Sequence, residues 1–408
     1  MLSSLLLVTL SWARDGGVAT HAMASAAALA SRGVNVHVAA AQVGSDAPVA
    51  GITVHHTPEL LNERLSPELR LGDALPWRPE VIHFHQFEDP DVLRYLRTLA
   101  PVVISAHGYT ACTSTMYYFR PGEECTRAHG PGCVPNLLLR GCAHTFDPRS
   151  LPSDYRQTTR QVDALHHADL AVSYSSAIDR HLSANDVTPR TVIPLFSTLE
   201  PAVGSGHADR RRVVFAGRVV APKGVAVLIR AAREVDAEFV ICGDGWQLPS
   251  MRRLAKRLGV QERVRFAGWL APAELARELA QASVVAVPSL WPEPFGLVGI
   301  EAHAAGRPVV ASATGGVRDW LHDGVSGLCV KPGDAGVLAS ALNELLADPE
   351  RQREMGEAGR RLVSERFTVE HHVSALTRAY ETAGAHWRSA AGDGKSVPSS
   401  DRAEPSPV

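Results

Sequence analysis

The chain has no excess of either charge: 41 lysine and arginine residues stand against 43 aspartates and glutamates in 408 residues. This near-balance gives no electrostatic basis for a general nucleic-acid-binding protein, which needs a strongly basic surface. A local anion site needs only two or three well-placed cations, so it is not excluded. We therefore expect no nucleic-acid partner.

Long apolar runs are also missing. The apolar stretch at the N-terminus, Leu2–Leu10, is too short to span a bilayer. It also lacks the basic segment and the small-residue cleavage site of a secretion signal. We interpret it as a buried first strand. No other stretch has membrane length, so we expect a cytoplasmic protein whose membrane contact is at most peripheral.

Cysteine is scarce, and four of the six cysteines fall in one segment: Cys112, Cys125, Cys133 and Cys142. In a chain otherwise poor in cysteine, such a cluster favours metal binding over disulfides. The spacing contains no Cys-x-x-Cys pair, so three interpretations stay open: a structural zinc site of four thiolates, an iron–sulfur cluster, or unbridged cysteines in a loop. Three flanking histidines could replace a thiolate: His107, His129 and His144.

The chain does contain short apolar runs that alternate with helical patterns, and this alternation occurs twice. The pattern is typical of α/β domains, in which helices cover both faces of a parallel sheet. In the first half it predicts a helix at 18–31 and strands at 4–10, 34–40, 81–84, 102–105 and 170–173. In the second half it predicts strands at 213–216, 239–242, 264–266, 284–288 and 309–311.

The same pattern sets the predicted boundaries: an N-terminal domain at 1–195 with a cysteine-containing insertion at 108–150, a linker at 196–212, a C-terminal domain at 213–367, a helix at 368–387 and a disordered tail at 388–408. Doubly wound sheets bind ligands at the carboxyl ends of their strands. If those ends face each other, the cleft between the domains is the expected site.

Two motifs follow strands at matching points of the two domains. Gly16 and Gly17 open the first helix, where glycines allow close backbone approach and the helix N-terminus favours anions. Arg218 and Lys223 follow the first strand of the second domain and could converge on a diphosphate. The structural alternatives are a tight strand-to-helix turn and an exposed basic loop.

A third motif runs from Glu293 to Glu301 and contains a glycine, Gly296, just before a predicted helix. The backbone N–H groups of Leu297 and Val298 would be unpaired at the helix start and would suit a phosphate or a sugar oxygen. Glu293 can accept hydrogen bonds from sugar hydroxyls, and Glu301 can reach ribose hydroxyls. An acidic residue that merely complements the helix dipole is the alternative.

The order and spacing of Gly217-Arg218, Lys223-Gly224 and the paired glutamates resemble the retaining family 4 glycosyltransferases, also called glycosyltransferase group 1. The resemblance covers residue 213 to about residue 380 and, more loosely, residues 1–40. It implies a GT-B fold: two Rossmann-like, doubly wound parallel-sheet domains that face each other across a cleft. It also implies that the N-terminal domain binds the acceptor and that the last helix crosses back to it.

The resemblance further implies residue roles. His107 matches a family histidine near the donor sugar, so the catalytic set would be Glu293, Arg218, Lys223 and His107. The donor-binding set would be Gly16, Gly17, Gly243, Asp244, Trp269, Leu270, Phe295, Gly296, Leu297, Val298 and Glu301.

The implied activity is transfer of a hexosyl unit from a UDP- or GDP-type sugar to a hydroxyl, with the anomeric configuration retained and no cofactor required for catalysis. Cations and helix N–H groups would stabilise the departing diphosphate. Asp89-Pro90-Asp91 superficially fits a metal-binding Asp-x-Asp motif, but we interpret it as a helix cap. The acceptor stays open among sugars, small molecules and lipid-linked sugars. The alternatives are a nucleotide-sugar epimerase or hydrolase and a non-catalytic nucleotide-sugar or metal-responsive binding protein.

Overall fold

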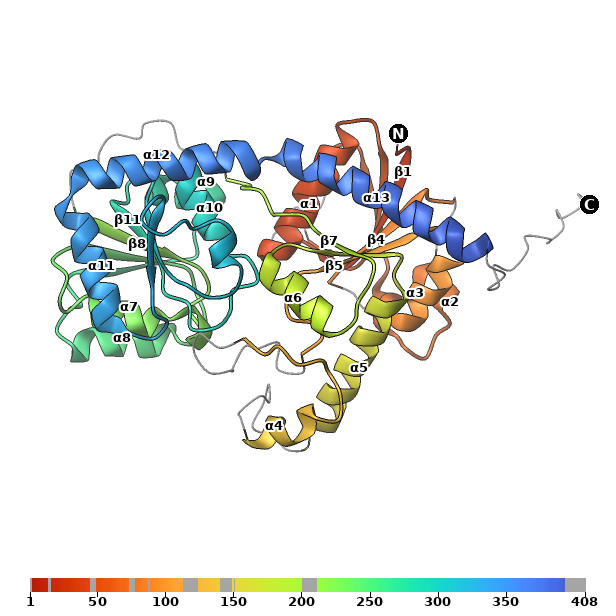
Figure 1. The fold of residues 1–408 in the computed structure, drawn as a ribbon, viewed down its shortest axis with the longest axis horizontal. Coiled ribbons are helices and arrows are strands. Elements are labelled where there is room, and N and C mark those ends of the chain that lie inside the picture. Colours follow the sequence, from red (N-terminus) through yellow and green to blue (C-terminus); the bar gives the residue numbers. More distant parts are fainter. Residues whose placement is uncertain are drawn as a thin grey trace, which may run out of the picture.

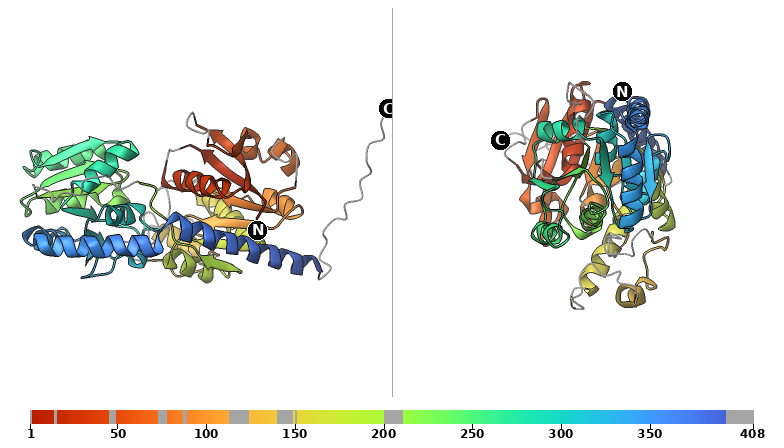
Figure 2. Two further views of the ribbon diagram at one scale, coloured as in Figure 1. Left: turned by 90° about the horizontal axis from the view of Figure 1, so that it is seen from above. Right: turned by 90° about the vertical axis from the view of Figure 1, so that its left-hand side faces the viewer.

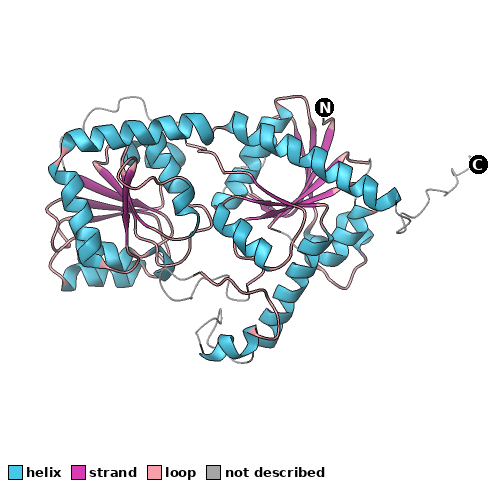
Figure 3. Ribbon diagram, viewed as in Figure 1, coloured by secondary structure: helices cyan, strands magenta, loops and turns pink. Residues whose placement is uncertain are grey.

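The computed structural model describes residues 2–13, 16–44, 49–72, 78–86, 89–112, 124–139, 149, 151–199 and 211–392. These residues form two lobes, each a sheet with helices packed around it, and a helical arm that runs along one side of both lobes (Figures 1 and 3). Every strand pair in the described residues is parallel.

The N-terminal lobe contains a seven-stranded sheet of order β3-β2-β1-β4-β5-β6-β7. Its strands are β1 (Ser4–Trp12), β2 (Asn35–Val43), β3 (Ile52–His56), β4 (Val81–His85), β5 (Val102–Ala106), β6 (Leu170–Ser173) and β7 (Arg190–Val192). Its helices are α1 (Gly17–Ala30), η1 (Pro58–Leu61), α2 (Pro67–Leu71), α3 (Pro90–Arg97), α4 (Cys133–Leu139), α5 (Leu151–His167) and α6 (Ser176–Ala184). The central strands β4 and β5 are buried along their whole length, as expected where helices cover both faces.

The C-terminal lobe contains a six-stranded sheet of order β10-β9-β8-β11-β12-β13. Its strands are β8 (Arg212–Ala216), β9 (Glu238–Cys242), β10 (Val264–Gly268), β11 (Val284–Val287), β12 (Val309–Ser312) and β13 (Gly327–Val330). Its helices are η3 (Ala221–Lys223), α7 (Val225–Ala231), α8 (Leu248–Arg257), α9 (Pro272–Ala280), α10 (Leu297–Ala304), η4 (Gly315–Asp319), α11 (Ala335–Ala347) and α12 (Pro349–Arg366).

Both sheets reverse their strand order beside their first strand. β1 lies between β2 and β4, and β8 lies between β9 and β11. At such a switch point the loops at the carboxyl ends of neighbouring strands turn apart and leave a crevice. Gly16 and Gly17 follow β1, and Gly217 follows β8, so both loops are placed at a crevice.

All strands predicted from the apolar runs are present, with ends shifted by a few residues. Three further strands went unpredicted: β3, β7 and β13, which lie at sheet edges. An edge strand has a neighbouring strand on one side only and is less buried, so its sequence is less consistently apolar, as the mostly half-buried β3 shows. The predicted cap is confirmed: the Asp89 carboxylate accepts hydrogen bonds from the backbone N–H of Asp91 and Val92, at 2.9 and 3.2 Å.

The arm consists of α12 and α13 (Val369–Gly392), which follow each other along one side of the molecule (Figure 2). α13 packs against α1, β5 and β6 of the N-terminal lobe, so the predicted return of the last helix is observed. The helix ends at Gly392, five residues later than the predicted position 387, so it includes the first residues of the predicted tail. Residues 393–408, and linker residues 200–210, lie outside the described part. None of the described helices is both long and apolar enough to span a membrane.

The lobes also meet opposite the arm. The backbone N–H and the hydroxyl of Ser176, at the start of α6, donate to the Asp319 carboxylate of η4 at 2.7 and 2.5 Å. The backbone N–H of Gly315 donates to Glu124 at 3.1 Å, and Glu124 also pairs with Arg180 at 3.1 Å. These contacts connect α6 and residue 124 of the N-terminal lobe to η4 of the C-terminal lobe.

Candidate active site

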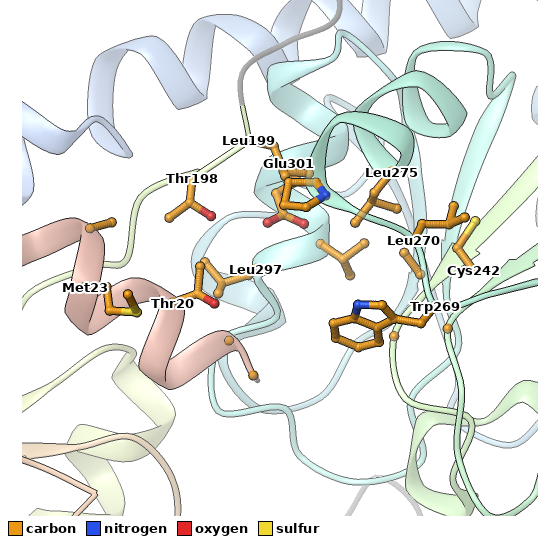
Figure 4. Close-up of a pocket in the computed structure, with 18 of the residues that line it drawn as sticks. Thr20, Met23, Thr198, Leu199, Cys242, Trp269, Leu270, Leu275, Leu297 and Glu301 are labelled. Carbon is orange, nitrogen blue, oxygen red and sulfur yellow. The ribbon is translucent and has the colours of Figure 1, made fainter. Parts of the chain in front are cut away.

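A cavity of about 460 Å³ lies between the two lobes at the switch points of both sheets. Figure 4 shows side chains of α1 on one side of it and side chains of α10 and of the loop after β10 on the other. Its walls are mostly apolar, with a few polar groups, as expected for a small-molecule site. Eight of the predicted donor-binding residues line it: Gly16, Gly17, Gly243, Trp269, Leu270, Leu297, Val298 and Glu301.

The N-terminal wall is one face of α1. Gly17 begins this helix, and a Cβ atom added there would lie 3.5 Å from Leu297 Cδ1 of the other lobe. This is an ordinary van der Waals distance, so the start of α1 lies directly opposite the start of α10. Thr20 and Met23 follow on the same face and point into the cavity (Figure 4).

The opposite wall is the start of α10. Gly296 is its N-cap with φ +92°, a left-handed conformation that glycine adopts without strain. Leu297 and Val298 then place the first turn of the helix at the cavity, where backbone N–H groups have no intrahelical partner. Glu301 lies one turn further, and burial raises its pKa to about 7.

Close backbone packing forms the wall of the cavity that follows β9. Gly243, at the end of β9, has φ +139°, and a Cβ atom there would lie 1.9 Å from the Gly217 carbonyl oxygen. Its N–H donates to the Gly268 carbonyl at 2.7 Å. Glycine is thus required for this loop to lie between its two neighbours. The next residue after Gly268, Trp269, is 65% exposed beside the cavity.

Lys223 and Glu293 form a buried ion pair next to the start of α10. The Lys223 ammonium donates to both carboxylate oxygens at 2.7 and 2.9 Å, and the Ser289 hydroxyl donates to one of them at 2.5 Å. The Glu293 side chain is only 3% exposed, and that of Lys223 is 22% exposed. Burial alone would raise the pKa of Glu293, but Lys223 and Ser289 outweigh it and lower that pKa. The carboxylate is therefore ionised at neutral pH.

The other predicted catalytic residues, Arg218 and His107, do not line the cavity. Arg218 is exposed and directly follows the cavity residue Gly217. His107 is half-buried at the carboxyl end of β5, and its Nε2 lies 2.9 Å from Nδ1 of His85. Burial and the neighbouring His85 and His372 hold the pKa of His107 well below its ordinary value, so this imidazole is neutral.

Three predicted donor-binding residues are absent from the cavity lining. Phe295 is buried in the core, where its carbonyl accepts a hydrogen bond from the Trp320 indole at 2.7 Å. Gly296 acts through its backbone conformation, as described above. Asp244 caps its own loop, with its carboxylate accepting from the N–H of Gly245 at 2.6 Å.

The cysteine cluster is only partly described. Cys112, Cys125 and Cys133 are half-buried and not disulfide-bonded, whereas Cys142 and His144 lie outside the described residues. Among the residues that the structure describes, no group of three or more His, Cys, Asp or Glu side chains is placed to hold a metal ion. The zinc, iron–sulfur and metal-free interpretations of this segment stay predictions.

Several cavity residues were missed by the sequence analysis: Thr20, Met23, Ala24, Ala27, Val49, Thr198, Leu199, Ala216, Cys242, Pro272 and Leu275. Four of them could have been predicted, because Thr20, Met23, Ala24 and Ala27 continue the helix face that starts at Gly16 and Gly17. Thr198 and Leu199 gave no local signal, since they come from the segment that follows β7.

Comparison with known proteins finds a family model that matches each lobe. Residues 15–196 match the model of Glycosyltransferase Family 4, and residues 202–362 match the model of Glycosyl transferases group 1. A GDP-mannose-dependent alpha-(1-6)-phosphatidylinositol monomannoside mannosyltransferase of Mycolicibacterium smegmatis is 39% identical over 166 residues, which are 38% of this chain and 44% of that protein. The D-inositol 3-phosphate glycosyltransferase of Mycobacterium tuberculosis is 29% identical over 405 residues, covering 90% of this chain and 79% of that protein.

The chain thus spans less than half the length of the first of these relatives and about four fifths of the second. Among solved structures, Anabaena HepE in complex with UDP and glucose superimposes with a TM-score of 0.70 at 20% identity, covering 93% of this chain and all of that one. The predicted fold, two Rossmann-like domains that face each other across a cleft, is confirmed.

Proposed function

Since its two lobes match the models of Glycosyltransferase Family 4 and Glycosyl transferases group 1, we propose that this chain is a glycosyltransferase that moves a hexosyl unit from a nucleotide-diphosphate sugar to a hydroxyl acceptor. We further propose that the anomeric configuration is retained. The observation that carries the proposal is the cavity between the lobes, which joins two helix N-termini, the carboxyl group of Glu301 and the loop before Arg218.

The diphosphate would lie between the start of α1 and the start of α10. Both helix ends present N–H groups and positive potential to an anion. Gly16 and Gly17 supply the close approach on one side, and Leu297 and Val298 supply the first turn on the other. Arg218 and Lys223 would add positive charge where the leaving group develops negative charge.

Glu293 fits a binding role better than a nucleophilic one. Its carboxylate is held by Lys223 and Ser289 and is almost fully buried, so it has little freedom to attack an anomeric carbon. A carboxylate fixed in this way can accept hydrogen bonds from hydroxyls of the transferred sugar. The departing phosphate oxygen would then take the acceptor proton, as in front-face transfer with retention.

The names of similar proteins suggest where to begin with substrates. One relative is GDP-mannose-dependent, another is a D-inositol 3-phosphate glycosyltransferase, and HepE was solved with UDP and glucose. We propose a UDP- or GDP-hexose donor and a hydroxyl acceptor on a sugar, a small molecule such as a cyclitol, or a lipid-linked sugar.

The test is an assay with UDP- and GDP-hexoses, with and without candidate acceptors, followed by mass spectrometry and NMR of the products. A transferase gives an acceptor-dependent glycoside, and retention gives the same anomeric configuration as the donor. An epimer formed without acceptor would favour the isomerase alternative. Nucleotide-sugar binding without any product, and unaffected by loss of Glu293, would favour a binding protein.

Donor binding is expected to strengthen as pH rises through about 7. We place the ribose hydroxyls against Glu301, and an ionised carboxylate is the better acceptor for them. Because burial raises the pKa of this carboxyl to about 7, its protonated form dominates below that pH. Affinity should therefore fall by up to about tenfold per pH unit below about pH 7 and level off above it.

Calorimetric titration with an intact nucleotide sugar measures this dependence, because its diphosphate does not itself titrate near neutrality. The Glu301→Gln variant is the control: it should bind more weakly and lose most of the pH dependence. Wild-type affinity that falls as pH rises through neutrality would contradict the assignment of Glu301 to the ribose.

A further inference from the structure

A cluster of buried imidazoles lies between the N-terminal sheet, α1 and α13. The histidine cluster consists of His21 on α1, His83 and His85 on β4, His107 after β5 and His372 on α13. The two members on β4 are nearly inaccessible to solvent. Burial is the largest cause of a lowered pKa at every member, so all are neutral at physiological pH.

Within this cluster, His85 and His107 contact each other directly. β4 and β5 are neighbouring parallel strands, and both residues stand at their carboxyl ends. Nδ1 of His85 lies 2.9 Å from Nε2 of His107, a hydrogen bond between two ring nitrogens. Within the described ranges, Nδ1 of His107 has no hydrogen-bond partner.

This contact couples the tautomers of the two rings. A neutral imidazole carries one proton, so one ring nitrogen donates and the other accepts. If Nδ1 of His85 donates, Nε2 of His107 accepts and Nδ1 of His107 carries the proton. If Nδ1 of His85 accepts, His107 is left with a bare Nδ1. In either case His85 determines whether Nδ1 of His107 can donate a hydrogen bond to a substrate or accept one from it.

The surroundings of His85 hold it in place. Its ring lies against that of His83, with ring centroids 4.1 Å apart. His83 is fixed at both nitrogens, by the hydroxyls of Tyr380 on α13 and Ser105 on β5, each at 2.8 Å. The Ser105 hydroxyl in turn hydrogen-bonds Tyr174 at 2.6 Å, and the Tyr174 ring packs on His107 with centroids 4.7 Å apart.

We propose that His85 is a positioning residue for sugar transfer, which fixes the orientation and the tautomer of His107 toward the donor sugar. The inference rests on the proposed function for its kinetic consequence, because only there does His107 meet the transferred sugar. The tautomer coupling itself follows from the ring contact and can be measured without substrate.

Two substitutions at one site separate positioning from packing. His85→Leu keeps an apolar side chain but removes the hydrogen bond, whereas His85→Asn places an amide near the position of the imidazole Nδ1 and can keep it. His181→Leu is the matched control, because His181 is an equally buried N-terminal-lobe histidine that packs on Tyr109, away from the pair.

Nitrogen NMR of the histidine rings should show matched tautomers of His85 and His107 in the wild type, with both rings protonated at Nδ1 or both at Nε2. The His107 tautomer ratio should stay near that of the wild type in His85→Asn and change in His85→Leu. In transfer assays, His85→Leu should lower kcat by about 10- to 100-fold with little change in the affinity for nucleoside diphosphate. His85→Asn should recover much of that loss, and His181→Leu should show no comparable loss.

An unchanged His107 tautomer in His85→Leu overturns the proposal whatever the enzyme does. Equal kcat losses in His85→Leu, His85→Asn and His181→Leu also overturn it, because they indicate packing alone. A wild type that transfers no sugar but shows the coupled tautomers refutes the proposed function and leaves the positioning contact established.

Discussion

Replacing Glu293 with glutamine is expected to lower the rate of sugar transfer by about 100- to 1,000-fold while the protein stays folded. The substitution keeps the shape of the side chain and removes its charge. The Lys223 ammonium, 2.7 Å away, then loses the anion that holds it in place. The substitution therefore changes two things at once: the carboxylate that accepts hydrogen bonds from the sugar hydroxyls, and the position of a cation near the diphosphate.

Steady-state kinetics, with calorimetric titration of the donor, measure this effect. Lys223→Met should cause a loss of similar size, and the double variant should lose far less than the product of the two, because the partners act as a unit. Glu370→Gln, an exposed carboxylate in the first turn of α13, is the control and should change the rate little. Full activity in Glu293→Gln would contradict the assignment of this residue to the active site.

Gly299→Ala is expected to destabilise the C-terminal lobe by about 3 kcal/mol, although alanine normally favours a helix. A Cβ atom at this position in α10 would lie 2.0 to 2.4 Å from three carbon atoms of the Trp320 ring. Trp320 is fully buried, and its indole N–H donates to the Phe295 carbonyl at 2.7 Å. The ring therefore cannot move aside without breaking that bond.

Because Trp320 also supports the loop before α10, donor binding should weaken along with stability. Thermal unfolding in the presence and absence of donor measures both effects. Gly384→Ala is the matched control on α13, where the nearest atom to an added Cβ is the flexible Arg388 guanidinium at 3.3 Å. That variant should gain about 0.5 to 1 kcal/mol. Equal stability of the two variants would refute the steric argument.

The convergence of distant motifs could be predicted because parallel strands bring their carboxyl ends to one edge of a sheet. Gly17 and Leu297 each open a helix at such an edge, Glu301 lies one turn into the second of these helices, and all three line one cavity. The fold was also predictable, since buried strands such as β11 are continuous apolar runs in the sequence.

Other features depend on tertiary contacts that no local pattern contains. The sequence suggested ligand roles for Lys223 and Glu293, but their direct ion pair joins positions 70 residues apart. The pairing of His85 with His107 depends on the register of β4 against β5. The burial of Phe295 depends on tertiary neighbours, since its ring packs against that of Phe367 and its carbonyl accepts from Trp320.

A crystal structure of the protein with a bound UDP- or GDP-hexose tests the central claim most directly. We expect the diphosphate between the starts of α1 and α10, the ribose at Glu301 and the sugar on the side of Glu293. A donor bound at any other surface, with the cavity between the lobes left empty, would contradict it.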